Sequence, residues 1–272
     1  MAGAFLEHLR ESWRVSGSML CVGLDPDPAK LPAALRGHPE RIGEFCREIV
    51  DATADLVCAF KPQIAYFAAA GAEDQLADLC AYIRAAHPQV TLILDAKRGD
   101  IGSTAEQYAV EAFDRYRAHA VTVNPYLGTD SVEPFLRYAD RGVFVLCRTS
   151  NPGGDDLQSL VVDGEPLFTR VARLVADRWN GGAQCGLVVG ATYPAELAAV
   201  RSFAPELPLL VPGVGAQGGD PAEVMVAGRD ADGAGLVVNS SRAVIYASSG
   251  TDYADAARRA AGETAAVLRV TT

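Results

Sequence analysis

The chain has 272 residues, of which 49% are hydrophobic, and its formal net charge is −10. A surface this acidic repels nucleic acid, so we expect no nucleic-acid partner, and an anionic ligand has to be held by local donors. No apolar run approaches the roughly 18 residues of a membrane helix, and the N-terminus lacks a basic-then-apolar signal segment, which together predict a cytoplasmic protein without membrane contact.

Short apolar segments rich in Val, Leu and Ile recur along the chain and predict β-strands. In chain order they are Met19–Leu24, Leu56–Lys61, Val90–Asp95, Ala120–Asn124, Val143–Cys147, Cys185–Val189, Leu207–Pro212 and Gly235–Asn239. They are apolar nearly throughout, as strands covered on both faces should be. Amphipathic helices are predicted between them, for example over Glu40–Ala54, Glu73–Ala86, Ser103–Ala118 and Asp252–Arg269.

The start of the third of these helices carries a local signal. Ser103 and Glu106 fit the S-x-x-E capping box, in which each side chain accepts a backbone N–H of the other residue. The sequence therefore predicts that this helix begins at Ser103.

The alternation of strands and helices predicts the fold class. Eight alternations favour a (β/α)8 TIM barrel, although their periodicity alone leaves a doubly wound sheet open. No linker or low-complexity stretch divides the chain, so we expect one barrel domain over residues 1–272. The longest irregular stretch, Arg148–Pro166, follows the fifth strand, and that position favours a functional lid over a disordered segment.

Cysteines and histidines give no sign of a metal or redox site. The six cysteines are Cys21, Cys46, Cys58, Cys80, Cys147 and Cys185. None belongs to a C-x-x-C pair, and the histidines are scattered, so zinc and redox motifs are not predicted. We expect buried thiols in a reducing cytosol.

Charged residues stand at the ends of three apolar strands. Catalytic groups in a barrel come from the C-terminal ends of several strands. Lysine is rare in this chain, yet Lys61 and Lys97 both lie at such ends, and Asp25 follows the first strand. Asp95 and Lys97 are two residues apart, so a continuing strand would point both to the same side. Asp100 follows in the loop.

This pattern has a structural and a functional interpretation. Asp95 with Lys97 could be a structural ion pair, and Asp100 could be a helix N-cap. However, ionised groups at a barrel mouth are costly to desolvate unless they are paired. Four charges of alternating sign on adjacent strand ends, from Asp25, Lys61, Asp95 and Lys97, favour a catalytic centre.

The ends of the seventh and eighth strands resemble a phosphate-binding site. The segment from Pro212 to Asp220 is rich in glycine, which lets a backbone approach a ligand closely. Its last residues, Gly219 and Asp220, precede Pro221 at a predicted helix start, where backbone N–H groups favour an anion. Arg242, after the eighth strand, can grip phosphate oxygens as a fork. Loops at these two positions bind phosphate in many barrels.

Taken together, these residues resemble the orotidine 5′-monophosphate decarboxylase family. The D-x-K-x-x-D motif of that family matches Asp95, Lys97 and Asp100, and its lysine on the second strand matches Lys61. Its aspartate on the first strand matches Asp25. The resemblance runs in order from about residue 21 to residue 246, and the long loop after the fifth strand resembles the longer bacterial branch.

The resemblance implies a reaction and a set of catalytic roles. The substrate would be orotidine 5′-monophosphate and the product uridine 5′-monophosphate, the last step of UMP synthesis, with no metal and no organic cofactor. Asp95 would press against the substrate carboxylate, and Lys97 would stabilise the carbanion at C6 and protonate it. Asp25 and Lys61 would hold ribose hydroxyls and complete the alternation of charge.

The resemblance also implies binding residues and a partner. Ser150 would contact the pyrimidine edge, Gln217 would bridge the base and the phosphate with Gly218 beside it, and Arg242 would bind phosphate. The family pattern places Asp100 and Thr104 in the site of a second subunit. The enzyme would therefore be a homodimer with shared active sites.

Two alternatives remain at this point. A magnesium-dependent sugar-phosphate decarboxylase or aldolase shares D-x-K-x-x-D but places a carboxylate at the second strand end, where this chain has Lys61. A non-catalytic nucleotide sensor would keep the fold, but loss of turnover usually shows as loss of the charged residues, and these are all present.

Overall fold

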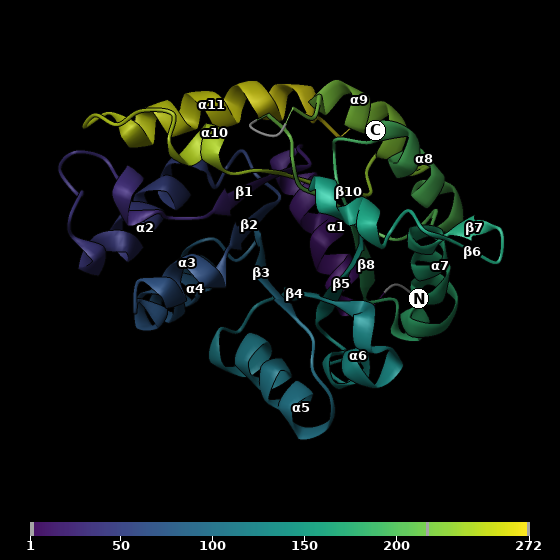
Figure 1. The fold of residues 1–272 in the computed structure, drawn as a ribbon. Helices are drawn as coiled ribbons and strands as arrows, with labels where there is room; N and C mark the ends of the chain where they lie inside the picture. The colour runs from purple at the N-terminus through teal and green to yellow at the C-terminus, as the bar shows by residue number, and fades with distance from the viewer. Residues whose placement is uncertain (1–2, 216–217, 271–272) are drawn as a thin grey trace.

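The computed structural model describes residues 3–215 and 218–270, and it forms a strand barrel surrounded by helices (Figure 1). Within these residues, eight parallel strands close in the order β1–β10–β9–β8–β5–β4–β3–β2. They are β1 (Leu20–Leu24), β2 (Ala59–Pro62), β3 (Thr91–Arg98), β4 (Ala120–Val123), β5 (Gly142–Arg148), β8 (Cys185–Val189), β9 (Leu209–Val211) and β10 (Leu236–Ser240). Because β1 pairs with both β2 and β10, the sheet has no free edge. The predicted TIM barrel is confirmed, and the doubly wound sheet is excluded.

Helices fill the connections and form the outer layer (Figure 1). They are α1 (Ala4–Ser16), α2 (Ile42–Thr53), α3 (Ile64–Ala69), α4 (Glu73–Ala86), α5 (Gly102–Val110), α6 (Thr129–Leu136), α7 (Leu167–Leu174), α8 (Pro194–Phe203), α9 (Pro221–Gly228), α10 (Arg242–Ile245) and α11 (Tyr253–Val267). The prediction for α4 is confirmed at both ends. No helix in the described ranges is long and apolar enough to cross a membrane.

The predicted capping box at the start of α5 is wrong. The helix begins at Gly102, so Ser103 already lies inside it, and the residue at the N-cap is Ile101, which makes no side-chain cap. Glu106 instead pairs with Nη1 of Arg137, the C-cap residue of the neighbouring helix α6, at 2.7 Å. A tertiary ion pair therefore replaces the local cap. The helix then changes at Glu111–Arg115 into a π-helical segment.

Helix α1 closes the N-terminal end of the barrel. Its Ser12 hydroxyl contacts the Thr91 hydroxyl at 2.8 Å, and its Trp13 indole donates to the Leu236 carbonyl at 2.8 Å. Both partners are the first residues of their strands. Phe5 packs on Phe144 edge to face. Since α1 covers this end, the opposite, C-terminal end of the strands is the mouth that is left for a ligand.

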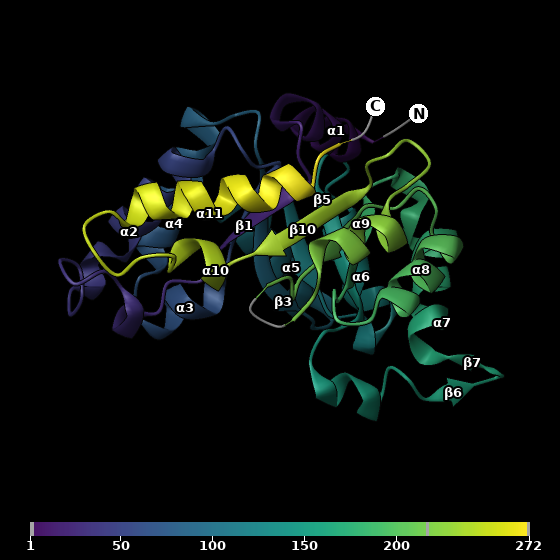
Figure 2. The same ribbon diagram turned by 90° about the horizontal axis from the view of Figure 1, so that it is seen from above.

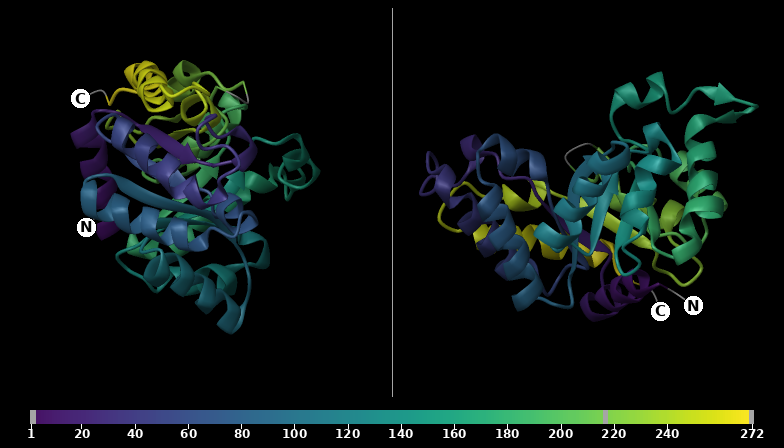
Figure 3. Two further views of the ribbon diagram at one scale, coloured as in Figure 1. Left: turned by 90° about the vertical axis from the view of Figure 1, so that its left-hand side faces the viewer. Right: turned by 90° about the horizontal axis from the view of Figure 1, so that it is seen from below.

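The segment after β5 is more regular than predicted. It contains a 3-10 helix at Pro152–Asp156 and a short antiparallel hairpin of β6 (Val161–Val162) and β7 (Glu165–Pro166). The hairpin projects away from the barrel (Figures 2 and 3). Only the part of the segment nearest β5 therefore lies at the barrel mouth.

Candidate active site

One cavity of about 490 Å³ opens at the C-terminal end of the barrel. Asp25 follows β1, Lys61 lies in β2, and Asp95 and Lys97 lie in β3; all four line this cavity. Parallel strands bring their C-terminal ends to the same rim, so residues up to 72 positions apart in sequence (97 − 25) meet there. We refer to these four residues as the charged centre.

Asp95 lies between the two lysines. Its Oδ2 accepts from Lys61 Nζ at 2.7 Å and its Oδ1 accepts from Lys97 Nζ at 2.5 Å. The Lys61 and Asp95 side chains are only 5% and 8% exposed, whereas that of Lys97 is 46% exposed. Of the two ammonium groups, that of Lys97 is therefore the more accessible to a ligand in the cavity.

The charges around Asp95 and Lys61 stabilise these two buried groups in their ionised forms. Burial by itself would raise the pKa of Asp95, but the nearby Lys61 and Lys97 ammonium groups outweigh it and hold that pKa well below its usual range. Burial by itself would lower the pKa of Lys61, but the Asp95 and Asp25 carboxylates outweigh it and raise that pKa. Both groups are charged at neutral pH.

The backbone at Lys97 differs from the predicted regular strand. Lys97 has a φ of 47°, a left-handed conformation that is uncommon for a residue with a side chain. The β3–β4 register also shifts between Leu94 and Arg98. Lys97 does reach Asp95, as predicted, but it does so from a bulge and not from a continuous strand.

Asp25, after β1, is held by a residue that follows the neighbouring strand β10. The Ser241 hydroxyl, in the loop after β10, donates to Asp25 Oδ2 at 2.5 Å. Asp25 Oδ1 is buried and has no hydrogen-bond partner within the described residues. An unpartnered carboxylate oxygen at a cavity wall is an acceptor suited to a ligand hydroxyl.

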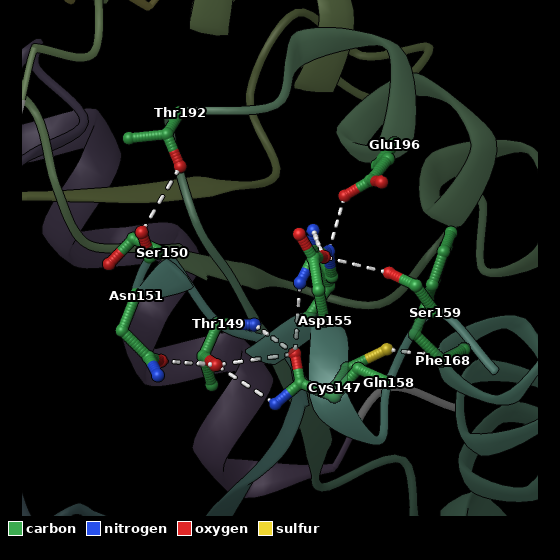
Figure 4. A network of polar contacts seen from close by, with 11 residues as sticks. Cys147, Thr149, Ser150, Asn151, Asp155, Gln158, Ser159, Phe168, Thr192 and Glu196 are labelled. Carbon is green, nitrogen blue, oxygen red and sulfur yellow. Dashed lines mark hydrogen bonds and ion pairs between the residues drawn. The ribbon is translucent and has the colours of Figure 1, made fainter. Parts of the chain in front are cut away.

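Ser150 lines the cavity at the end of β5, and a polar network lies directly behind it (Figure 4). Gln158 Oε1 accepts from the Thr149 N–H at 2.8 Å, and Thr192 Oγ1 donates to the Ser150 carbonyl at 3.5 Å. Gly190 lies so close that a Cβ there would come within 2.8 Å of the Ser150 Cα. The Ser150 backbone is therefore packed between two loops.

Arg148 is the ionic anchor of the same network. Its side chain is only 1% exposed; Nη2 donates to Asp155 Oδ1 at 2.6 Å, and Nε pairs with Glu196 of α8. Its guanidinium also lies 4.3 Å from the ring centroid of Tyr193. Arg148 thus connects the end of β5, the segment after it and helix α8.

The predicted phosphate-binding loops lie on the same rim as Ser150. Gly213 and Arg242 line the cavity, and helix α9 begins at Pro221 after an Asp220 N-cap, as expected. Gly218 has a φ of 89° and donates its N–H to the Gly215 carbonyl at 2.9 Å; it is not among the described residues that line the cavity. Gln217 lies outside the described residues.

Asp100 and Thr104 lie apart from the charged centre. Asp100 Oδ1 accepts the N–H of Ile101 at 2.8 Å, so it is not the N-cap of α5, and Thr104 is exposed on that helix. Neither is among the described residues lining the cavity. The structure therefore brings together Asp25, Lys61, Asp95, Lys97, Ser150 and Arg242, and leaves Asp100 and Thr104 on the outer rim.

Two further residues that support the site, Thr122 and Arg148, are not predicted from the sequence. Thr122 lines the cavity, and its hydroxyl donates to Asp95 Oδ1 at 3.0 Å. A polar residue within the apolar run of β4 was the available signal. The sequence analysis places Arg148 only at the start of the irregular stretch after the fifth strand. An arginine that ends an apolar strand needs an ionic partner when it is buried, and that was the signal for its role.

Comparison with known proteins gives consistent results. Residues 18–259 match the model of the family described as orotidine 5′-phosphate decarboxylase / HUMPS. The orotidine 5′-phosphate decarboxylase of Azoarcus sp. is 65% identical over 260 residues, and that of Bordetella pertussis is 62% identical over 267 residues; at least 96% of each chain is covered. A solved structure of the Leishmania donovani OMP decarboxylase has a TM-score of 0.83 at 39% identity and covers 98% of this chain and 99% of its own.

Proposed function

This chain belongs to the orotidine 5′-phosphate decarboxylase / HUMPS family, and from that premise we propose how its residues carry out the reaction. The chain is a carboxy-lyase that decarboxylates orotidine 5′-monophosphate to uridine 5′-monophosphate, the last step of UMP synthesis. The observation that carries the proposed mechanism is the buried Asp95 held between two ammonium groups at the cavity wall. Residues 1–272 act as one barrel domain.

Asp95 and Lys97 are the proposed reacting pair. The substrate carboxylate lies beside Asp95, where the repulsion between two carboxylates is relieved as CO2 leaves. The bond from C6 to the carboxyl carbon breaks, and its electron pair stays on C6 in the plane of the ring. Lys97 is the more exposed member of the Asp95–Lys97 ion pair. In this proposal its Nζ faces the electron pair on C6. It then donates a proton to C6, and its neutral amine takes a proton back from water.

Electrostatics can supply a useful part of the rate. Two unit charges about 4 Å apart interact by roughly 4 kcal/mol at an effective dielectric constant of 20. Enzymes commonly lower barriers by roughly 8–23 kcal/mol. The Lys97 ammonium is already oriented by Asp95, so little reorganisation is needed when the carbanion forms. Binding energy from the rest of the substrate contributes the remainder.

The rest of the substrate binds around the rim. Asp25 and Lys61 hold ribose hydroxyls, and the unpartnered Oδ1 of Asp25 can accept a hydrogen bond from one of them. Ser150 contacts the pyrimidine edge from the opposite side of the cavity. Gln217, Gly218 and Arg242 bind the phosphate end.

The charged centre also weighs against both alternatives. A magnesium-dependent sugar-phosphate enzyme needs a carboxylate at the end of β2, but Lys61 lies there and places its ammonium 2.7 Å from Asp95 Oδ2. That ammonium would repel a divalent cation at this position. A sensor that had lost turnover would not need Asp95 and Lys97 paired in a cavity.

The test is the absorbance of orotidine 5′-monophosphate mixed with purified protein in excess EDTA. We expect rapid loss of the orotate chromophore. No change with folded protein would contradict the function, and turnover of sugar phosphates only after adding Mg²⁺ would support the first alternative. Tight product binding without any turnover would support the sensor.

The chain also forms a homodimer in this proposal, with Asp100 and Thr104 reaching into the partner's site. Both lie on the rim outside their own cavity. Large apolar side chains are exposed nearby, with Ile101 at 54%, Tyr126 at 77% and Leu127 at 48%. A second subunit that covers these side chains would bury apolar area and bring its Asp100 to the cavity. A cytoplasmic location is proposed because all six cysteines are free and buried.

Mixing two inactive variants tests the shared site. Lys97→Ala and Asp100→Ala subunits should each be inactive alone, and their mixture should regain part of the activity, because a mixed dimer has one site with neither change. No recovery despite confirmed subunit exchange would place the whole site within one chain.

A further inference from the structure

Thr122 of β4 lies where the β3 strand departs from regular pairing. Leu94 is paired with Val121, and Arg98 is paired with Val123. Between these pairs β3 has three residues, 95 to 97, and β4 has one, Thr122. The two extra residues form a bulge, and bulges commonly re-aim a side chain next to an active site.

The Thr122 hydroxyl satisfies the backbone of this bulge. Its Oγ1 accepts the N–H groups of Ala96 and Lys97, both at 3.0 Å. These N–H groups have left the regular pairing with β4, and a buried N–H without an acceptor is costly. Lys97 also has a left-handed backbone, which persists only where its surroundings enforce it.

The same hydroxyl also reaches the carboxylate of the charged centre. It donates to Asp95 Oδ1 at 3.0 Å, the oxygen that accepts from Lys97 Nζ. With two lone pairs accepting and one proton donated, the hydrogen-bonding capacity of Thr122 is full. Its side chain is buried, and Thr122 is only 1% exposed. One hydroxyl therefore holds both the backbone that presents Lys97 and the carboxylate that orients it.

We propose that Thr122 is a positioning residue for decarboxylation, which holds the Asp95–Lys97 pair in its reactive geometry through the bulge in β3. The inference rests on the proposed roles of Asp95 and Lys97. Because the Thr122 hydroxyl already accepts two hydrogen bonds and donates one within the chain, it has none left to offer the substrate. Its effect is therefore on the reaction step and not on the binding of the product.

The test compares Thr122→Val with Thr122→Ser. Valine keeps the branched shape but removes the hydroxyl, so we expect kcat to fall by about 100-fold, the cost typical of a misplacement of about 1 Å. The dissociation constant of uridine 5′-monophosphate, which lacks the carboxylate, should change by less than about threefold. Serine keeps the hydroxyl and should restore kcat to within about fivefold of the unaltered protein.

Thr91→Val is the matched control. Thr91 is a buried strand threonine at the other end of β3, and its hydroxyl contacts Ser12 at 2.8 Å. Its replacement should lower the melting temperature and leave kcat unchanged. If Thr122→Val also lowers only the melting temperature, with native kcat in the folded protein, the proposal is overturned.

A further variant covers the case in which Thr122→Val does not fold. Thr122→Cys carries a weaker donor and acceptor, so an intermediate loss of kcat of about tenfold is expected, and native kcat would overturn the proposal. The unaltered protein must first turn over orotidine 5′-monophosphate. If it does not, the proposed function fails, and that outcome is distinct from failure of the Thr122 inference.

Discussion

The two sides of the barrel mouth hold their charges in opposite ways. On the β1–β4 side, Lys61 and Lys97 each donate a hydrogen bond to Asp95 inside the chain. On the β5–β10 side, Arg242 is exposed and makes no ion pair within the described residues. The buried cation of that side, Arg148, is held away from the cavity by Asp155 and Glu196.

The difference separates two tasks. Groups that stabilise a transition state work best when their orientation is set before the substrate arrives. A group that grips phosphate gains most when its donors are still available to the ligand. The charged centre is therefore expected to affect the rate constant, and the other side of the mouth to affect affinity.

Lys97→Ala is the strongest test of this separation between rate and affinity. We expect turnover to fall by at least about 1,000-fold, because both the cation beside the reacting carbon and the proton donor are lost. Loss of the orotate absorbance measures turnover, and circular dichroism checks the fold. The affinity for uridine 5′-monophosphate should remain similar. Near-native turnover would refute the role of Lys97.

Arg242→Ala should have its main effect on binding. Loss of a charged hydrogen-bonding group costs about 1.5–3 kcal/mol, so KM should rise by roughly 10- to 100-fold while kcat changes little. Uridine 5′-monophosphate should lose affinity, whereas uridine should not. Arg259→Ala on α11 is a control at an exposed arginine, since among the described residues Arg259 forms an ion pair only with exposed Asp252, at 3.5 Å. An unchanged KM would argue against the phosphate assignment.

Arg148→Met tests whether the buried anchor supports Ser150. Without its bonds to Asp155 and Glu196, the strand end before Ser150 should loosen, so we expect kcat/KM to fall by about tenfold and the melting temperature by a few degrees. Arg170→Met is the control from the neighbouring helix α7, because its pair with Asp163 is exposed. Equal kcat/KM for the two variants would show that the network is not needed for substrate binding.

The smallest effect concerns pH and lies at the closed end of the barrel. His119 Nδ1 accepts the Leu92 N–H at 2.9 Å, and burial, aided by stacked His8 and by Arg84 and Arg141, lowers its pKa to about 2. The unfolded chain, with a pKa of about 6.5, binds more protons below that pH. The stabilising contribution of neutral His119 is therefore fully present above pH 6.5. Below that pH, protonation of the unfolded chain lowers the free energy of unfolding by at most about 1.4 kcal/mol per pH unit.

Thermal unfolding at pH 7.5 and 5.5 measures this loss, with His119→Asn as the comparison because its amide oxygen can still accept from Leu92. The variant should lose less stability on acidification, and equal losses would contradict the assignment. The pKa of Asp95 is also lowered, so its stabilising contribution is present above its usual pKa and is lost only at much lower pH. Asp95 should therefore not contribute to the loss of stability between pH 7.5 and 5.5.

Much of the charged centre could be predicted because it depends on local patterns. An apolar run long enough to be a strand, followed by a charged residue, identifies a strand end, and a barrel brings all such ends to one rim. Asp25, Lys61, Asp95 and Lys97 were placed at one mouth in this way, and they do line one cavity. Whether Gln217 joins them stays a prediction, since it lies outside the described residues.

The tertiary structure decided what the local patterns could not. Thr122 serves the charged centre because β3 bulges against it, and that shift depends on the pairing of two strands and not on either sequence alone. Arg148 forms an ion pair with Glu196, 48 positions away in sequence. Glu106 does not form the predicted capping box and instead pairs with Arg137, 31 positions away. Hydrophobic periodicity is set by near neighbours and is readable in one sequence, whereas the partner of a polar side chain depends on which distant segments the closed barrel brings within hydrogen-bonding distance.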